Sequence, residues 1–142
     1  LLAMEHDWTK KTFDNAAASL RKHKYSLYID KMDLNDLRHY LLGKRDFLLR
    51  LIENPNLLEH ERFTDMLWSV FHLTEELVQR QSLDNLSDND KNHLHNDMKR
   101  AYRAITFEWI EYARYLQMAY PFLFNLMMRT NPFNPNASIY VS

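Results

Sequence analysis

Two pairs of side chains in this sequence could hold a metal ion. His72 and Glu76 lie four residues apart, as do His93 and Asp97, and side chains at that spacing share one face of a helix. Helical bundles build metal sites from inward-facing histidines and carboxylates of this kind. One interpretation is therefore a helical bundle that binds a metal or a small ligand, with His72, Glu76, His93 and Glu108 as candidate ligands.

The alternative is that none of the seven histidines binds a metal. The di-iron pattern of helical bundles requires a Glu-x-x-His step on two helices, and the sequence contains none. His60 stands between Glu59 and Glu61, close to a predicted helix start, which is typical of a solvated surface. We therefore expect all seven histidines to be solvated or hydrogen-bonded, with no metal and no cofactor bound.

A pair of glutamates suggests a second kind of chemistry. Glu108 and Glu111 lie three residues apart in an aromatic stretch, and paired carboxylates can act as acid and base in a cleft. Arg114 follows Glu111 by three residues, with Arg103 and Arg100 on preceding turns, so a buried ion pair is the favoured interpretation. The sequence has no hydrolase elbow, phosphate-binding glycine loop or zinc-protease motif, and we expect no enzyme.

Near the start of the chain, positions 10 to 24 contain five basic residues and a single acidic residue, Asp14. They are Lys10, Lys11, Arg21, Lys22 and Lys24. Such a run could lie beside a membrane that carries anionic lipid. Taken alone, the run is better explained as the solvated face of a helix.

Near the other end, four aromatic residues are difficult to bury under one short helix. They are Tyr120, Phe122, Phe124 and Phe133. Either these rings cap one end of a bundle, or they form a contact surface for another subunit or partner.

The composition predicts one all-α domain. The 142 residues include one glycine and no cysteine, which argues against a sheet-rich fold and excludes thiolate chemistry. A net charge of −1 argues against a nucleic-acid partner, and no apolar run reaches the roughly 18 residues needed to span a membrane. We expect residues 1–142 to form a soluble domain excised from a longer protein.

Apolar periodicity places four long helices at about 4–23, 34–54, 57–81 and 88–119. In the fourth helix the spacing predicts one continuous apolar face, made of Leu94, Met98, Ala101, Ile105, Trp109, Tyr112, Leu116 and Tyr120. Asp33 is the expected N-cap of the second helix, and Ser87 with Asp90 resembles a capping box before the fourth. Pro121 suits the first turn of a short helix over 121–129, followed by an extended arm over 131–142. Short links between long helices predict an antiparallel four-helix bundle.

Several strings resemble a known family. They are FLLRLIENP at 47–55, LLEHE at 57–61, LWSVFHLTEEL at 67–77, RAY at 100–102, EW at 108–109, YPFLF at 120–124 and RTNPF at 129–133. Together they resemble the soluble helical domain of archaeal and bacterial two-transmembrane, potassium-channel-like ion channels. The resemblance spans roughly residues 41–137.

This resemblance implies a cytosolic assembly or regulatory module on the inner face of the cell membrane. It implies self-association through the parent protein, with the basic first helix near the membrane surface, and it supplies no catalytic residues. Two other hypotheses stay open beside it. One is the metal- or ligand-binding bundle, and the other is an interaction adaptor that docks through the 131–142 arm.

Overall fold

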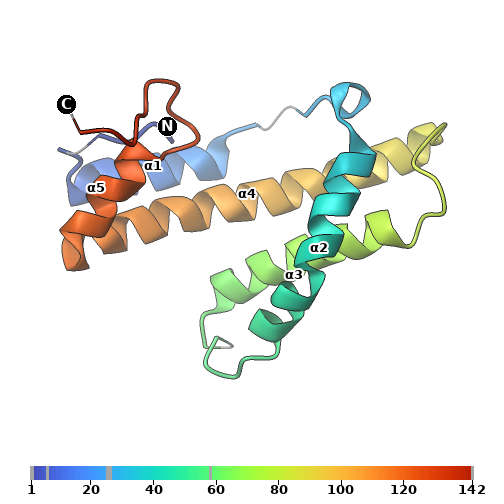
Figure 1. Cartoon of the computed structure of the whole chain (residues 1–142), viewed down its shortest axis with the longest axis horizontal. Helices are drawn as coiled ribbons and strands as arrows, with labels where there is room; N and C mark the ends of the chain where they lie inside the picture. Colours follow the sequence, from blue (N-terminus) through green and yellow to red (C-terminus); the bar gives the residue numbers. More distant parts are fainter. Residues whose placement is uncertain (1, 6, 25–26, 58, 142) are drawn as a thin grey trace. The chain divides into compact units, whose positions relative to one another are not determined.

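The computed structural model describes residues 2–5, 7–24, 27–57 and 59–141. Their regular structure is entirely helical, which confirms the all-α prediction (Figure 1). The elements are α1 (Lys10–Lys22), the 3₁₀ turn η1 (Ile29–Lys31), α2 (Leu34–Ile52), α3 (Glu61–Val78), α4 (Asp88–Ala119) and α5 (Pro121–Arg129). No helix within these residues combines the length and the apolar composition needed to cross a membrane.

Side-chain hydrogen bonds at their first turns explain where α1, α2 and α4 begin. Asp33 caps α2 as predicted, by accepting a hydrogen bond from a backbone N–H three residues later. Ser87 precedes α4, and its hydroxyl accepts a hydrogen bond from the N–H of Asp90. The first helix starts later than predicted because Thr9 and Thr12 form a capping box there. The bounds of α4 and α5 match the prediction.

The described residues group into two compact units, residues 25–105 and residues 1–24 with 106–142. The structure therefore does not confirm a single antiparallel bundle of four long helices. The short C-terminal helix is present as α5.

In the unit of residues 25–105, α3 runs antiparallel to both α2 and the first part of α4. Paired contacts with α4 show this, because His72 lies opposite Asp97 whereas Arg80 lies opposite Asp90. Contacts with α2 show the same, because Arg38 bonds the carbonyl of Arg80 whereas Arg45 pairs with Glu75. Leucines of α3 pack against Leu94 and Met98 of α4 and against leucines of α2. This packing holds α3 and α4 side by side and fixes which of their turns face each other.

In the other unit, α1 runs antiparallel to the second part of α4. Arg114 of α4 bonds Asp14, and Gln117 donates a hydrogen bond to the backbone carbonyl of Trp8. Phe13 is fully buried and meets the ring of Phe124 edge-on. The remaining core of this unit comes from α1, α5 and Ile110, Ala113 and Leu116 of α4.

The buried face of α4 changes along the helix, which differs from the predicted continuous stripe. Leu94, Met98 and Ala101 are buried, and after them the buried positions shift to Thr106, Ile110, Ala113 and Leu116. Ile105 and Tyr112, which the straight stripe placed in the core, are exposed. The two ends of α4 belong to different units, so each end buries a different face.

The segment after α5 begins with two successive turns over residues 131–137, where the sequence predicted the start of an extended arm. The side chains of Asn131 and Asn134 each accept a hydrogen bond from the backbone N–H two residues later. The backbone carbonyls of the same two residues accept from Asn134 and Ala137. The repeated Asn-Pro step favours this Asx-turn geometry. Ser142, the last residue of the predicted arm, lies outside the described residues.

Candidate metal centre

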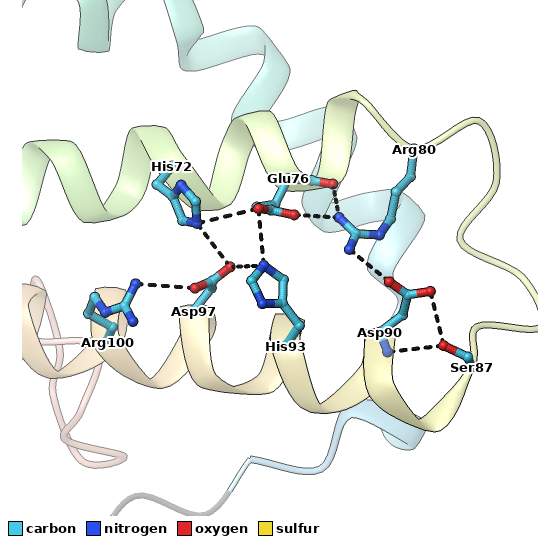
Figure 2. A network of polar contacts seen from close by, with 8 residues as sticks. All are labelled: His72, Glu76, Arg80, Ser87, Asp90, His93, Asp97 and Arg100. Carbon is cyan, nitrogen blue, oxygen red and sulfur yellow. Dashed lines mark hydrogen bonds and ion pairs between the residues drawn. The ribbon is translucent and has the colours of Figure 1, made fainter.

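Four side chains from α3 and α4 converge in the unit of residues 25–105. His72 and Glu76 lie one turn apart on α3, and His93 and Asp97 lie one turn apart on α4. Because the helices run antiparallel, His72 faces Asp97 and Glu76 faces His93, as Figure 2 shows. Each helix thus contributes one nitrogen donor and one oxygen donor to the same point.

The donor atoms form a closed ring in which nitrogen and oxygen alternate. The Nε2 atom of His72 lies 3.5 Å from Oε1 of Glu76 and 3.2 Å from Oδ2 of Asp97. The Nε2 atom of His93 lies 3.0 Å from Oε1 of Glu76 and 3.2 Å from the same Oδ2. All four donors lie within 4.8 Å of one another.

Asp97 is the most unusual member of this ring. Its side chain is only 3% exposed, and its Oδ2 atom is buried without accepting a hydrogen bond. Both histidine Nε2 atoms lie 3.2 Å from Oδ2, but neither ring N–H is aligned to donate to it. The other oxygen, Oδ1, accepts a hydrogen bond from Arg100. A buried carboxylate oxygen is therefore aimed at the centre of the ring with no proton donor on it.

Glu76 is oriented in the same way by a neighbouring arginine. Nη1 of Arg80 lies 2.7 Å from Oε2 of Glu76, which leaves Oε1 facing the two histidines. A second nitrogen of Arg80 bonds Asp90, whose other oxygen accepts a hydrogen bond from Ser87 (Figure 2). This chain of contacts fixes the Glu76 carboxylate, as outer partners do for the ligands of metal sites.

The electrostatics of the ring favour a positive charge at its centre. The Glu76 carboxylate beside Nε2 raises the pKa of His93, and the negative charge of Asp97 adds to this effect. The pKa of Glu76 is lowered, first by the hydrogen bond from Arg80 and then by the hydrogen bond from His93. Two carboxylates that point at one place need a cation between them, either a protonated histidine or a metal ion.

The spacing of the donors fits a metal ion. Neighbouring donors 3.0–3.5 Å apart leave room for one ion at about 2.0–2.4 Å from each, close to zinc–nitrogen and zinc–oxygen bonds of about 2.0–2.2 Å. All four ligands come from helices packed against each other, so the frame that holds them is rigid.

Three of the four candidate ligands named from the sequence are brought together, and the fourth is not. Glu108 belongs to the other compact unit and stands 11 residues beyond Asp97 on α4. The fourth candidate ligand in the structure is Asp97, whereas the sequence predicted Glu108. The i, i+4 spacing of His93 and Asp97 is the signal in the sequence that identifies Asp97.

The predicted ion pair near Glu108 is present at Glu111. Arg114 bonds both Glu111 and Asp14, and it joins α4 to α1 in their unit. The five basic residues at 10–24 are exposed, and the guanidinium of Arg21 lies over the ring of Phe107. Their juxtamembrane role stays a prediction.

The four C-terminal aromatics divide into two groups. Phe124 is 2% exposed within the core, and the ring of Phe133 meets Trp109 edge-on, so these two rings pack inside their unit. Tyr120 and Phe122 are exposed. Only the exposed pair is therefore available to another subunit or a partner.

A family described as "Uncharacterized protein MJ1433, C-terminal helical domain" matches residues 1–129. The chain belongs to this family. It is 41% identical over 140 residues to the protein MJ1433 of Methanocaldococcus jannaschii, covering 99% of this chain and 56% of that protein. The chain therefore spans little more than half the length of this relative. No solved structure matches it.

Membership of this family corrects the resemblance to ion channels. Neither the family description nor the relative's name mentions a channel, a pore or potassium, so the channel assignment is wrong. The strings that suggested it are mainly apolar and aromatic stretches of α2, α3 and α5. Amphipathic helices of unrelated proteins share such stretches because the same periodicity buries one face of any helix.

Proposed function

We propose that this chain is a non-enzymatic helical module that binds one divalent transition-metal ion, such as Zn²⁺, through His72, Glu76, His93 and Asp97. The observation that carries the proposal is the buried Oδ2 of Asp97, which faces two histidine nitrogens and accepts no hydrogen bond. A metal ion at the centre of the ring gives this oxygen a partner and neutralises both carboxylates.

An ion-pair network without metal explains the same contacts less well. Protonated histidines would donate hydrogen bonds, and their N–H groups would point at the carboxylate oxygens. Here the ring nitrogens are close to Oδ2 but are not aligned to donate to it. His93 is hydrogen-bonded to Glu76, but Oδ2 of Asp97 has no donor, and a metal ion at the centre of the ring would give that oxygen a partner.

The ligand types favour a borderline divalent ion. Two imidazoles suit zinc, cobalt, nickel or iron, whereas magnesium and calcium prefer an all-oxygen shell. The chain has no cysteine, so no thiolate contributes to the site. Two carboxylates balance the charge of a divalent ion.

The number of protein ligands supports a structural role. Catalytic zinc sites use three protein ligands and keep a position open for water or substrate, whereas structural sites are closed by four. Four ligands from two helices would clamp α3 to α4 within about two and a half turns of the α3–α4 loop. The metal would then contribute free energy to folding of this unit.

The test is metal analysis of protein that was purified without a polyhistidine tag and dialysed against metal-free buffer. We expect zinc, cobalt or nickel to bind with one ion per chain when titrated by calorimetry, and magnesium to give no heat of binding. His93→Gln should abolish binding. The matched control is His95→Gln on the same helix, because His95 lies outside the donor set.

Two results would refute the proposal. One is the absence of any saturable binding by the parent chain at micromolar zinc, cobalt or nickel. The other is binding that His93→Gln and His95→Gln weaken equally, since that would place the metal on scattered surface histidines.

A further inference from the structure

A long stretch of the chain carries no charge and yet is partly exposed. From Tyr115 to Met128 the sequence has no Asp, Glu, Lys or Arg, across the end of α4 and nearly all of α5. Seven large apolar or aromatic side chains here and one turn before are between 37% and 79% exposed, while the others pack in the core. We call them the aromatic surface: Tyr112, Tyr115, Met118, Tyr120, Phe122, Leu123 and Leu126.

Ring contacts and helical spacing connect five members of the aromatic surface. The ring centroids of Tyr115 and Tyr120 are 6.0 Å apart, and those of Tyr120 and Phe122 are 6.3 Å apart, both edge-on. Met118 follows Tyr115 by three residues, and Leu126 follows Phe122 by four, so each extends the surface along its own helix.

The exposed area is large for a monomer. If a side chain of this size has about 200 Å² of solvent-accessible surface when fully exposed, the seven exposed fractions amount to about 700 Å² of accessible surface. The largest apolar patch on a typical monomer is about 300–600 Å², whereas each partner in a standard protein interface buries about 800 Å². The aromatic surface is therefore of the size that one half of a stable dimer needs.

We infer that the aromatic surface is the site at which a second copy of this chain binds. This inference does not depend on the metal site, which lies in the other compact unit. In a two-fold dimer identical surfaces face each other, so charges on the surface would meet like charges. A surface without charged side chains avoids that repulsion, and exposed tyrosine, phenylalanine and methionine are residues that interfaces favour.

The charge pattern argues against other occupants. Nucleic acid and anionic lipid are recognised through lysine and arginine, and the run from 115 to 128 has neither. A partner recognised through complementary charges would likewise find no counterpart on it. A second copy is the occupant that needs only apolar and aromatic complementarity.

The experiment is sedimentation velocity of the full chain from low micromolar to sub-millimolar concentration, with and without a chelator. We expect a monomer–dimer equilibrium that the chelator does not abolish. The double variant Met118→Glu, Phe122→Glu should raise the dissociation constant about 100-fold or more, because both side chains are among the most exposed on the surface. The matched control is Phe47→Glu, an exposed aromatic on α2 in the other unit, which should dimerise like the parent.

A cross-linking measurement locates the contact independently. The chain has no cysteine, so Phe122→Cys introduces a single thiol. We expect mild oxidation to give a covalent dimer with Phe122→Cys but not with Phe47→Cys.

Three results would overturn the inference. The parent chain could stay monomeric at every concentration, or dimers could persist unchanged in the double variant. The third result is a parent chain that is monomeric and sediments with anionic vesicles, while the double variant does not sediment with them. That result would assign the surface to lipid instead.

Discussion

Replacing Asp97 with asparagine should separate a metal ligand from a structural ion-pair partner. The side chain is 3% exposed, and its Oδ2 accepts no hydrogen bond. In metal-free protein a buried acceptor without a donor costs about 1–3 kcal/mol, and a neutral amide is cheaper to bury than a carboxylate. The lost contact with Arg100 matters little, because that arginine is 62% exposed.

Metal should reverse the order of stability. An ion present at about 100 times its Kd stabilises the folded state by about 2.7 kcal/mol. In a chain of this length 1 kcal/mol moves the Tm by about 4 °C, so zinc should raise the Tm of the parent by about 10 °C. Asp97→Asn lacks the anionic ligand, so zinc should raise its Tm only slightly. The Tm of the variant should therefore equal or exceed the Tm of the parent in chelator, and it should fall clearly below the Tm of the parent in zinc.

The assay is thermal unfolding followed by circular dichroism, in chelator and in excess zinc, for three proteins. The third protein is Glu75→Gln, which makes the same carboxylate-to-amide change on α3 at a residue that faces Arg45 instead of the ring. Its zinc response should match that of the parent. If chelated Asp97→Asn is much less stable than the chelated parent, Asp97 is a structural ion-pair partner of the histidines. If zinc stabilises that variant as much as it stabilises the parent, Asp97 is not a ligand.

Three further predictions follow from other contacts. Arg80→Ala frees Oε2 of Glu76 and should weaken zinc binding about 10–100-fold in calorimetry, without abolishing it. Phe13→Ala empties a fully buried position in the α1–α5 unit and should cost about 3–5 kcal/mol in urea unfolding of that unit, with the zinc affinity of the folded protein unchanged. Arg45 lowers the pKa of Glu75, so Glu75→Gln should reduce the stability of chelated protein above the unfolded glutamate pKa of about 4.3. That difference should disappear in melts as the pH falls through the lowered folded pKa, and a difference that persists in acid would exclude the ion pair as its cause.

Local signals in the sequence were sufficient for much of the fold. Asp33 predicts the start of α2 and Pro121 predicts the start of α5, because capping and proline geometry act within a few residues of the chain. The Asn-Pro repeat after α5 was harder to interpret, since it excludes a helix but allows both an extended arm and successive turns. The side-chain oxygens of Asn131 and Asn134, which accept hydrogen bonds from backbone N–H groups, select the turns.

The site shows a limit of helical periodicity. Asp97 and Glu108 are 11 residues apart, about three full turns, so a helical wheel places both on nearly the same face of α4. The wheel gives the direction of a side chain but not its height along the helix. Which carboxylate meets His72 depends on the register between α3 and α4, and their core packing sets that register.

The same limit explains the continuous stripe predicted for α4. Ile105, Trp109 and Tyr112 continue the spacing of Leu94 and Ala101, and all of them are large and apolar or aromatic. Burial nevertheless follows whichever neighbours are present, and these change from α3 to α1 along the helix. Tyr112 thereby joins the aromatic surface instead of the core.

The choice between a metal site and a cluster of ion pairs depends on what each would require of the side chains. An ion-pair cluster is satisfied when a protonated ring nitrogen donates to each carboxylate oxygen, and here His93 is hydrogen-bonded to Glu76 while no donor reaches Oδ2 of Asp97. A coordination shell requires each donor to present a lone pair to one point and each carboxylate to be held from behind. Glu76 and Asp97 each have one oxygen held by an arginine and the other turned to the same two Nε2 atoms. One oxygen held by an arginine and the other turned to the histidines is the arrangement expected for metal ligands with outer partners. A cluster that only pairs charges would not require this arrangement.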